Sequence, residues 1–170
     1  LALKHNPKML KALAAAEPER ADVLVVGFGT GADSLRGYDR LSNLKVLPVQ
    51  PMDEFPEVLA SADVLAAVIE AEAGEYSVPS KVLSYLCAGR PIVLAAPHEN
   101  LAAQIITKSG AGIVVSPNDT TEFVRAAQHF LDDKNAASSA GLAGRRYAKN
   151  HFTISKIADR FEHAFVDMKK

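Results

Sequence analysis

The sequence has little cysteine and almost no net charge, and both shortages limit what the protein can do. Cys87 is the single cysteine among 170 residues, so no disulfide can form within the chain, and a lone thiol favours a reducing compartment. Its apolar neighbours favour a small core residue over a reactive nucleophile. The 19 basic and 20 acidic side chains give a formal net charge of -1, so no overall field attracts nucleic acid or an anionic membrane. Any phosphate must therefore bind at a local site.

Long apolar runs are also absent. The longest, such as 64–69, have about six residues, whereas a helix needs about 20 to cross a bilayer. Residues 1–7 lack the apolar core and cleavage site of a signal peptide, and the chain does not open with methionine. We therefore expect a part of a longer protein. Its length suits one domain with a buried core.

Short aliphatic runs alternate with amphipathic stretches along the whole chain. The expected strands are residues 22–27, 44–47, 63–69, 91–96 and 112–115. The expected helices are residues 7–16, 33–40, 53–61, 80–89, 99–109, 120–132, 135–150 and 153–169. Strands with so little polar alternation are typically covered on both faces. The pattern predicts an α/β fold with an open parallel sheet, right-handed crossovers and helices on both faces.

The order of these elements carries two further expectations. The series starts with a helix, so we expect that a strand preceding this helix is missing from the given residues. The last two helices have no strand between them, and they either wrap around the domain or reach toward a missing partner. Ligands of such sheets bind beyond the carboxyl ends of the strands. The loops of interest are therefore residues 27–31, 48–51, 70–80, 97–100 and 116–119.

Residues 70–93 offer the strongest candidate for chemistry, because they read as a strand end, a polar loop, a helix start, a glycine stop and a strand. Unpaired N–H groups at the helix start form an anion site together with the helix dipole. Ser77 and Ser80 add hydroxyl donors, and Lys81 adds a positive charge that is unfavourable there without an anion nearby. A capped surface helix with a solvated lysine explains the same residues about as well.

Several motifs, taken in order, resemble one family. Val78-Pro-Ser-Lys81 followed by Tyr85-Leu-Cys-Ala-Gly-Arg-Pro91 is similar to the "PSK…Y-x-A-x-G-x-P" stretch of retaining glycosyltransferases of the GT-B fold, the "glycosyl transferases group 1" type. Val25-Val-Gly-Phe-Gly29, residues 46–63 and residues 110–119 are similar to its other elements. The resemblance implies that residues 1–170 form the Rossmann-like, nucleotide-sugar-binding C-terminal domain of a two-domain enzyme. The N-terminal acceptor domain would be its missing partner.

The resemblance also implies roles for individual residues, although it assigns no catalytic residue. Ser77, Ser80 and Lys81 would bind the donor diphosphate, and Ser84, Gln50 and Val49 would lie at the ribose and base. The further candidates for the cleft are Gly29, Glu75, Tyr76, His98 and Lys4. Many members carry Glu-x7-Glu here, but Tyr76 and Ser84 occupy those positions in this chain, which leaves ribose binding and donor choice open.

The implied activity is transfer of a hexose from a nucleotide-diphosphate sugar to an acceptor hydroxyl. That donor is a substrate, and we expect no metal and no other cofactor. The expected location is the cytoplasm, at the inner face of a membrane through the missing domain, with no nucleic-acid partner. The 170 residues alone are expected to be inactive. Two alternatives stay open: a nucleotide-sugar epimerase of similar fold, and a non-enzymatic Rossmann-like binding module.

Overall fold

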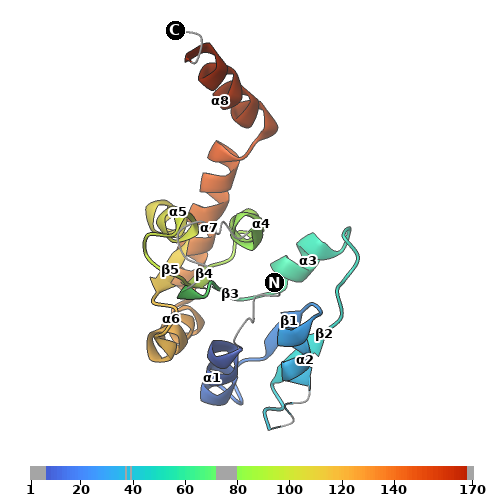
Figure 1. Ribbon diagram of the computed structural model, residues 1–170. Helices are drawn as coiled ribbons and strands as arrows, with labels where there is room; N and C mark the ends of the chain where they lie inside the picture. The colour runs from blue at the N-terminus through green and yellow to red at the C-terminus, as the bar shows by residue number, and fades with distance from the viewer. Residues whose placement is uncertain (1–6, 37, 39, 72–79, 168–170) are drawn as a thin grey trace.

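Strands and helices alternate as the sequence predicts. The computed structural model describes residues 7–36, 38, 40–71 and 80–167 (Figure 1). The strands are β1 (Val23–Val26), β2 (Leu44–Leu47), β3 (Leu65–Val68), β4 (Ile92–Ala95) and β5 (Gly112–Val115). The helices are α1 (Lys8–Ala16), α2 (Thr30–Arg36), α3 (Phe55–Ala60), α4 (Ser80–Ala88), α5 (Leu101–Ser109), α6 (Thr120–Asp132), α7 (Lys134–His151) and α8 (Ile154–Asp167).

Every pair of neighbouring strands is parallel, but the described strands form two sheets. β1 pairs with β2, and β3, β4 and β5 pair in that order. In the larger sheet Leu65 lies opposite Ile92, and Ile92 lies opposite Gly112. Within the described residues no ladder joins β1 to β3. The predicted parallel sheet is therefore divided between its first two strands and its last three.

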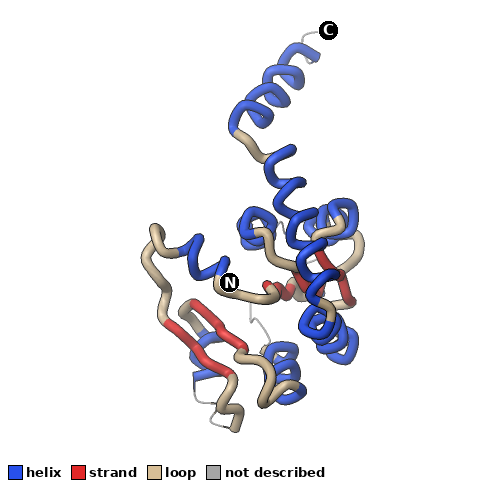
Figure 2. The backbone as a smooth tube through the Cα atoms, turned by 180° about the vertical axis from the view of Figure 1, so that it is seen from behind, coloured by secondary structure: helices blue, strands red, loops and turns tan. Residues whose placement is uncertain are grey.

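Helices cover both faces of the larger sheet (Figure 2), and β4 shows this most clearly. It is buried along its whole length, and its alternate side chains enter different clusters. Ile92 and Leu94 pack with residues of α4, α5 and α7, whereas Val93 and Ala95 pack with residues of α1 and α6. Successive side chains of a strand point to opposite faces, so the two clusters lie on opposite sides of the sheet.

β1 departs from the expectation that its strand is covered on both faces. Val23 is buried among residues of α1 and α2, but Leu24 is 52% exposed and Val26 is 38% exposed. The physical reason is the division of the sheet. Among the described residues, β1 pairs with β2 alone, and helices pack against one of its faces. An apolar run such as that of β1 is typical of a strand in the middle of a sheet, whereas the described residues pair β1 with β2 only.

Local signals set most of the element boundaries. The side chain of Asn100 accepts the N–H of Ala102 at the start of α5, and Asp119 accepts the N–H of Glu122 at the start of α6. Gly89 and Gly110 follow α4 and α5 with φ of 70° and 69°, a conformation that glycine adopts without steric cost.

Some predicted details are wrong. The helix expected at 33–40 is α2, Thr30–Arg36, so it begins and ends earlier. The helix expected at 53–61 is the shorter α3, which starts near Pro56 after Glu54 rather than at a cap by Asp53. Cys87 is exposed rather than buried, because α4 turns Val82 and Leu86 into the core instead.

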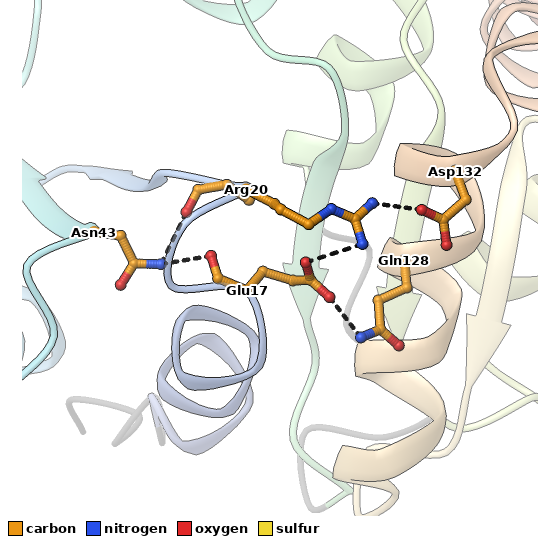
Figure 3. Close-up of polar contacts among 6 residues, drawn as sticks. Glu17, Arg20, Asn43, Gln128 and Asp132 are labelled. Atoms are coloured by element: carbon orange, nitrogen blue, oxygen red, sulfur yellow. Dashed lines mark hydrogen bonds and ion pairs between the residues drawn. The ribbon is translucent and has the colours of Figure 1, made fainter.

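A polar cluster holds the end of α1 against β2 and α6 (Figure 3). The buried Asn43 amide donates to the carbonyls of Ala14, Glu17 and Ala21 at 2.8–3.1 Å, so it caps the last turn of α1 from the start of β2. The Glu17 side chain accepts from Gln128 of α6 at 2.6 Å. These bonds fix α1 relative to both sheets.

The last two helices behave differently from each other. α7 packs along α4 and against α5 and β5, whereas α8 projects away from the other elements (Figure 1). Ile154 and Phe161 of α8 are 87% and 62% exposed. Of the two alternatives for the final helices, α8 does not wrap around the domain.

Candidate functional site

The predicted site residues that the structure describes all lie beyond carboxyl ends of strands. Gly29 follows β1 with φ of 98°, Val49 and Gln50 follow β2, and His98 follows β4. Ser80, Lys81 and Ser84 belong to α4, which lies between β3 and β4 in the chain. The remaining predicted residues, Lys4, Glu75, Tyr76 and Ser77, lie outside the described residues.

The first turn of α4 is held firmly while its polar side chains stay accessible. Val82 and Leu86 are 1% and 0% exposed and anchor the helix in the core. The hydroxyl of Tyr85 donates to the carbonyl of Ala66 in β3 at 3.4 Å. Ser80 and Lys81 are exposed, and Ser84 is half-buried. The anchoring face therefore leaves the Ser80 hydroxyl and the Lys81 ammonium group exposed at the helix start.

Within the described residues, the first turn of α4 also contains no acidic side chain that would repel an anion. Asp33, Glu57 and Glu122 lie in the first turns of α2, α3 and α6, and their charges already complement those helix dipoles. Neither α4 nor α5 has an acidic residue in its first turn, and α5 is capped by Asn100. Of the described helices that follow a strand, α4 is the one whose first turn contains a lysine and no acidic residue.

The other described candidates are exposed or hydrogen-bonded within their own loop. Gln50 donates to the carbonyl of Pro48 in its own loop at 2.8 Å. Val49 is 57% exposed, and Gly29 and His98 are exposed as well. The structure thus places these residues at the expected edge, without bringing them into one enclosed site within the described ranges.

A pocket of about 180 Å³ lies at the carboxyl ends of β3 and β5, beside the start of α1. It is lined by Lys8, Met9, Val68, Glu70, Pro117, Asn118 and Thr120. Ligand pockets typically have about 300–1,000 Å³, so this one suits only part of a nucleotide sugar. Lys8 and Glu70 bring opposite charges to it, and each already has an interaction partner.

Sequence reasoning missed most of these lining residues. It selected the loops at 70–80 and 116–119 but assigned no binding role to Asn118 or Thr120. Lys8 was missed altogether. The positions of these loops could be predicted from the ends of the expected strands. The approach of α1 to β3 and β5 could not, because it depends on packing between segments that are distant in the sequence.

A larger hollow of about 310 Å³ lies elsewhere, between α2 and β2. It is lined by Leu35, Arg36, Tyr38, Leu41, Ser42, Leu44 and Val46. Ser42 and Leu44 lead into β2, so the hollow reaches toward the amino end of that strand. Ligands of parallel sheets bind at the opposite end, so this hollow is a poor candidate for the site.

Two other kinds of site receive no support from the described part of the chain. No three of its His, Cys, Asp or Glu side chains are grouped as metal ligands. None of its helices is both long enough and apolar enough to cross a membrane.

Parallel strands joined by helices, with helices on both faces of the larger sheet, define a Rossmann-like domain of the kind found in GT-B glycosyltransferases. Residues 3–133 match the family model described as "Glycosyl transferases group 1", and the chain belongs to this family. The family resemblance drawn from the sequence is thereby confirmed. No curated relative matches the sequence.

Two solved structures show the same fold. WaaG, a glycosyltransferase involved in lipopolysaccharide biosynthesis, is 19% identical with a TM-score of 0.65, over 82% of this chain and 38% of that one. Sucrose-phosphate synthase from Thermosynechococcus elongatus is 16% identical with a TM-score of 0.75, over 94% of this chain and 41% of that one. The chain therefore spans about two fifths of the length of these structures.

Proposed function

We propose that this chain is the donor-binding domain of a glycosyltransferase. A nucleotide-diphosphate sugar would bind at the carboxyl edge with its diphosphate at the start of α4. The sugar, a hexose, would pass to an acceptor hydroxyl held by another domain of the same enzyme. The observation that carries the proposal is the anchored start of α4, where Ser80 and Lys81 are exposed and the first turn has no acidic side chain. Family membership supports this assignment.

The chemistry follows from where charge develops. When the bond between the sugar and the diphosphate breaks, negative charge grows on the leaving diphosphate oxygens. Fixed N–H groups and a nearby ammonium stabilise such charge without having to reorganise. Lys81 and the Ser80 hydroxyl would supply this stabilisation, so we expect neither a metal ion nor another cofactor to be required. Ser84, one turn further along α4, would reach a ribose hydroxyl.

The acceptor and any general base would come from outside these 170 residues, so the chain by itself would bind donor and transfer no sugar. We place the whole enzyme in the cytoplasm, where nucleotide sugars would reach this edge of the sheet. The pocket at Lys8 and Glu70 would receive a part of the donor beyond the diphosphate.

A thermal-shift panel with UDP, GDP, ADP and CDP tests the proposal. A ligand that binds only the folded state at about 100 times its Kd adds about 2.7 kcal/mol to stability. We expect one nucleotide to raise the Tm of the wild type and the rise to be lost in Lys81→Ala. Lys108→Ala is the matched control, because Lys108 is an exposed lysine in the last turn of α5. An equal rise in all three proteins would contradict the role of Lys81.

A further inference from the structure

Phe28 is a large apolar side chain that lies just beyond the carboxyl end of β1. Among the described residues its side chain is 84% exposed. Single exposed apolar side chains are common, so this exposure alone assigns no role. The position of Phe28 is more informative, because it stands between Gly27 and Gly29, in a turn at the edge where ligands of parallel sheets bind.

The pairing of β1 with β2 sets Phe28 beside Val49. Val26 lies opposite Leu47, and the ladder continues past the strand ends, because the Gly27 N–H donates to the carbonyl of Leu47 at 3.1 Å. The same register continued by two residues places Phe28 next to Val49, which is 57% exposed. Neighbouring strands lie about 4.8 Å apart, so these two side chains are close enough to form one apolar surface.

Helix α1 defines which side of the molecule this surface occupies. Its Leu10 and Leu13 pack against the cluster that contains Val23 of β1 and against the cluster that contains Val93 of β4. One helix therefore covers the near side of both sheets. α4 packs on the opposite side of the larger sheet, with α5 and α7 (Figure 1).

The exposed side chains of the small sheet point away from α1, toward the side on which α4 lies. Val23 packs into the cluster that includes α1, whereas Leu24 and Val26 are exposed. Successive side chains of a strand alternate between its faces, so Phe28 continues the series of Leu24 and Val26. The apolar surface and the start of α4 thus share one face of the domain, at the carboxyl edge.

Charge separates these two surfaces. Residues 23–32 and 46–52 contain no charged side chain, so the ends of β1 and β2 offer a diphosphate no ionic partner. The first turn of α4 contains Lys81 and no acidic side chain, as an anion site requires. An uncharged planar ring suits the first surface, and a diphosphate suits the second.

We propose that Phe28 stacks on the nucleobase of the donor and that this base is a purine. The inference rests on the proposed donor-binding function, and it gives a role to a residue that the sequence analysis left without one. Aromatic side chains stack on bases of any kind, and removing such a ring weakens binding about 5- to 150-fold. The two fused rings of a purine cover Phe28 and the adjoining Val49, whereas a single pyrimidine ring covers little more than Phe28.

Calorimetric titration of the whole enzyme with ADP, GDP, UDP and CDP tests the proposal. We expect ADP or GDP to bind more tightly than either pyrimidine nucleotide. Phe28→Ala should raise the Kd of that purine nucleotide by at least about fivefold. Phe28→Tyr keeps the ring and should keep the affinity, whereas Phe28→Leu stays apolar without a planar face and should lose affinity.

Leu142→Ala is the matched control for these variants. Leu142 is another large exposed apolar side chain, at 61%, but it belongs to α7, which packs beside the end of α4 rather than its start. This variant should bind every nucleotide as the wild type does. Since the side chains of Phe28 and Leu142 are both exposed, their variants should keep the fold.

The contrary outcomes separate this inference from the function on which it rests. Tighter binding of UDP or CDP, or an unchanged Kd in Phe28→Ala, would overturn the purine stack. If Lys81→Ala abolished that same binding, the donor-binding function would stand without it. Purine binding that needs Phe28 but not Lys81 would support the stack and contradict the diphosphate site, and a failure of all four nucleotides to bind would contradict both.

Discussion

Tyr85 shows how one residue beneath the candidate site combines anchoring with a titratable group. Its ring packs against the core, and its hydroxyl donates to the carbonyl of Ala66 in β3. Burial raises the pKa of Tyr85 above its ordinary value of 10.0, because the phenolate would lose its hydration there. The start of α4 is thus held to β3 by a neutral side chain.

A pH dependence follows from this raised pKa. The folded state holds the Tyr85 proton more tightly than the unfolded state, so its contribution to stability is complete below about pH 10 and is lost as the pH rises through the folded-state pKa. Tyr85→Phe has no such proton, so we expect it to lose less stability than the wild type above pH 10. Urea unfolding from pH 7 to pH 11 measures the difference.

The neutral range supplies the control for that comparison. At pH 7 the variant loses only a long hydrogen bond of 3.4 Å, so the free energy of unfolding should fall by less than about 1 kcal/mol. Parallel alkaline profiles of the two proteins would show that the Tyr85 phenol does not limit alkaline stability.

At the scale of elements, the contact between α4 and α7 depends on a glycine. A Cβ at Gly141 would lie 2.2 Å from the carbonyl oxygen of Gly89, which is backbone and has little freedom to move. Gly144 is similar, since its Cβ would lie 3.0 Å from that of Ala111. The small residues let α7 approach the end of α4 and support the helix that carries Lys81.

Gly141→Ala should therefore destabilise the protein, although alanine favours helix more than glycine does. We expect a loss of about 3 kcal/mol in the free energy of unfolding, since overpacking against backbone outweighs a propensity gain of about 1 kcal/mol. Ser139→Ala, an exposed position of the same helix, is the control and should change little. Chemical denaturation of both variants decides the matter, and an unchanged Gly141→Ala would mean that α7 shifts easily.

At the scale of the whole molecule, the buried Glu17 joins parts that are distant in the chain (Figure 3). Glu17 is 4% exposed, accepts from Gln128 of α6, and lies 3.4 Å from Arg20. Arg20 in turn pairs with Asp132, and these neighbours raise its pKa, the Asp132 hydrogen bond most of all. Arg20 and Asp132 are exposed, so the buried bond between Glu17 and Gln128 should dominate.

A double-mutant cycle measures that bond. Glu17→Ala and Gln128→Ala should each lower the free energy of unfolding, with a coupling energy of about 1.5–3 kcal/mol, as for hydrogen bonds to charged groups. Arg20→Ala is the control and should cause little change because its side chain is 55% exposed. A coupling near zero would show that α1 is held to α6 by apolar packing alone.

The sequence by itself determined the fold class and the edge at which to look for the site. Apolar runs, caps and glycine stops act within a few residues, so the five strands and the helix from Ser80 to Gly89 were readable locally. The ordered motifs identified the family because each of them is also a short local sequence pattern. The helix boundaries predicted near Asp33 and Asp53 were less accurate.

Only the tertiary structure decided how distant segments meet. The sequence did not predict the division of the described strands into two sheets, the exposure of Leu24, or the pocket that brings Lys8 to Glu70. Each depends on pairing or packing between segments separated by about 40 to 110 residues, where no local periodicity carries information. Strand neighbours are chosen by hydrogen bonds across the sheet and by helices such as α1 that lie over it, and these interactions exist only in the folded chain.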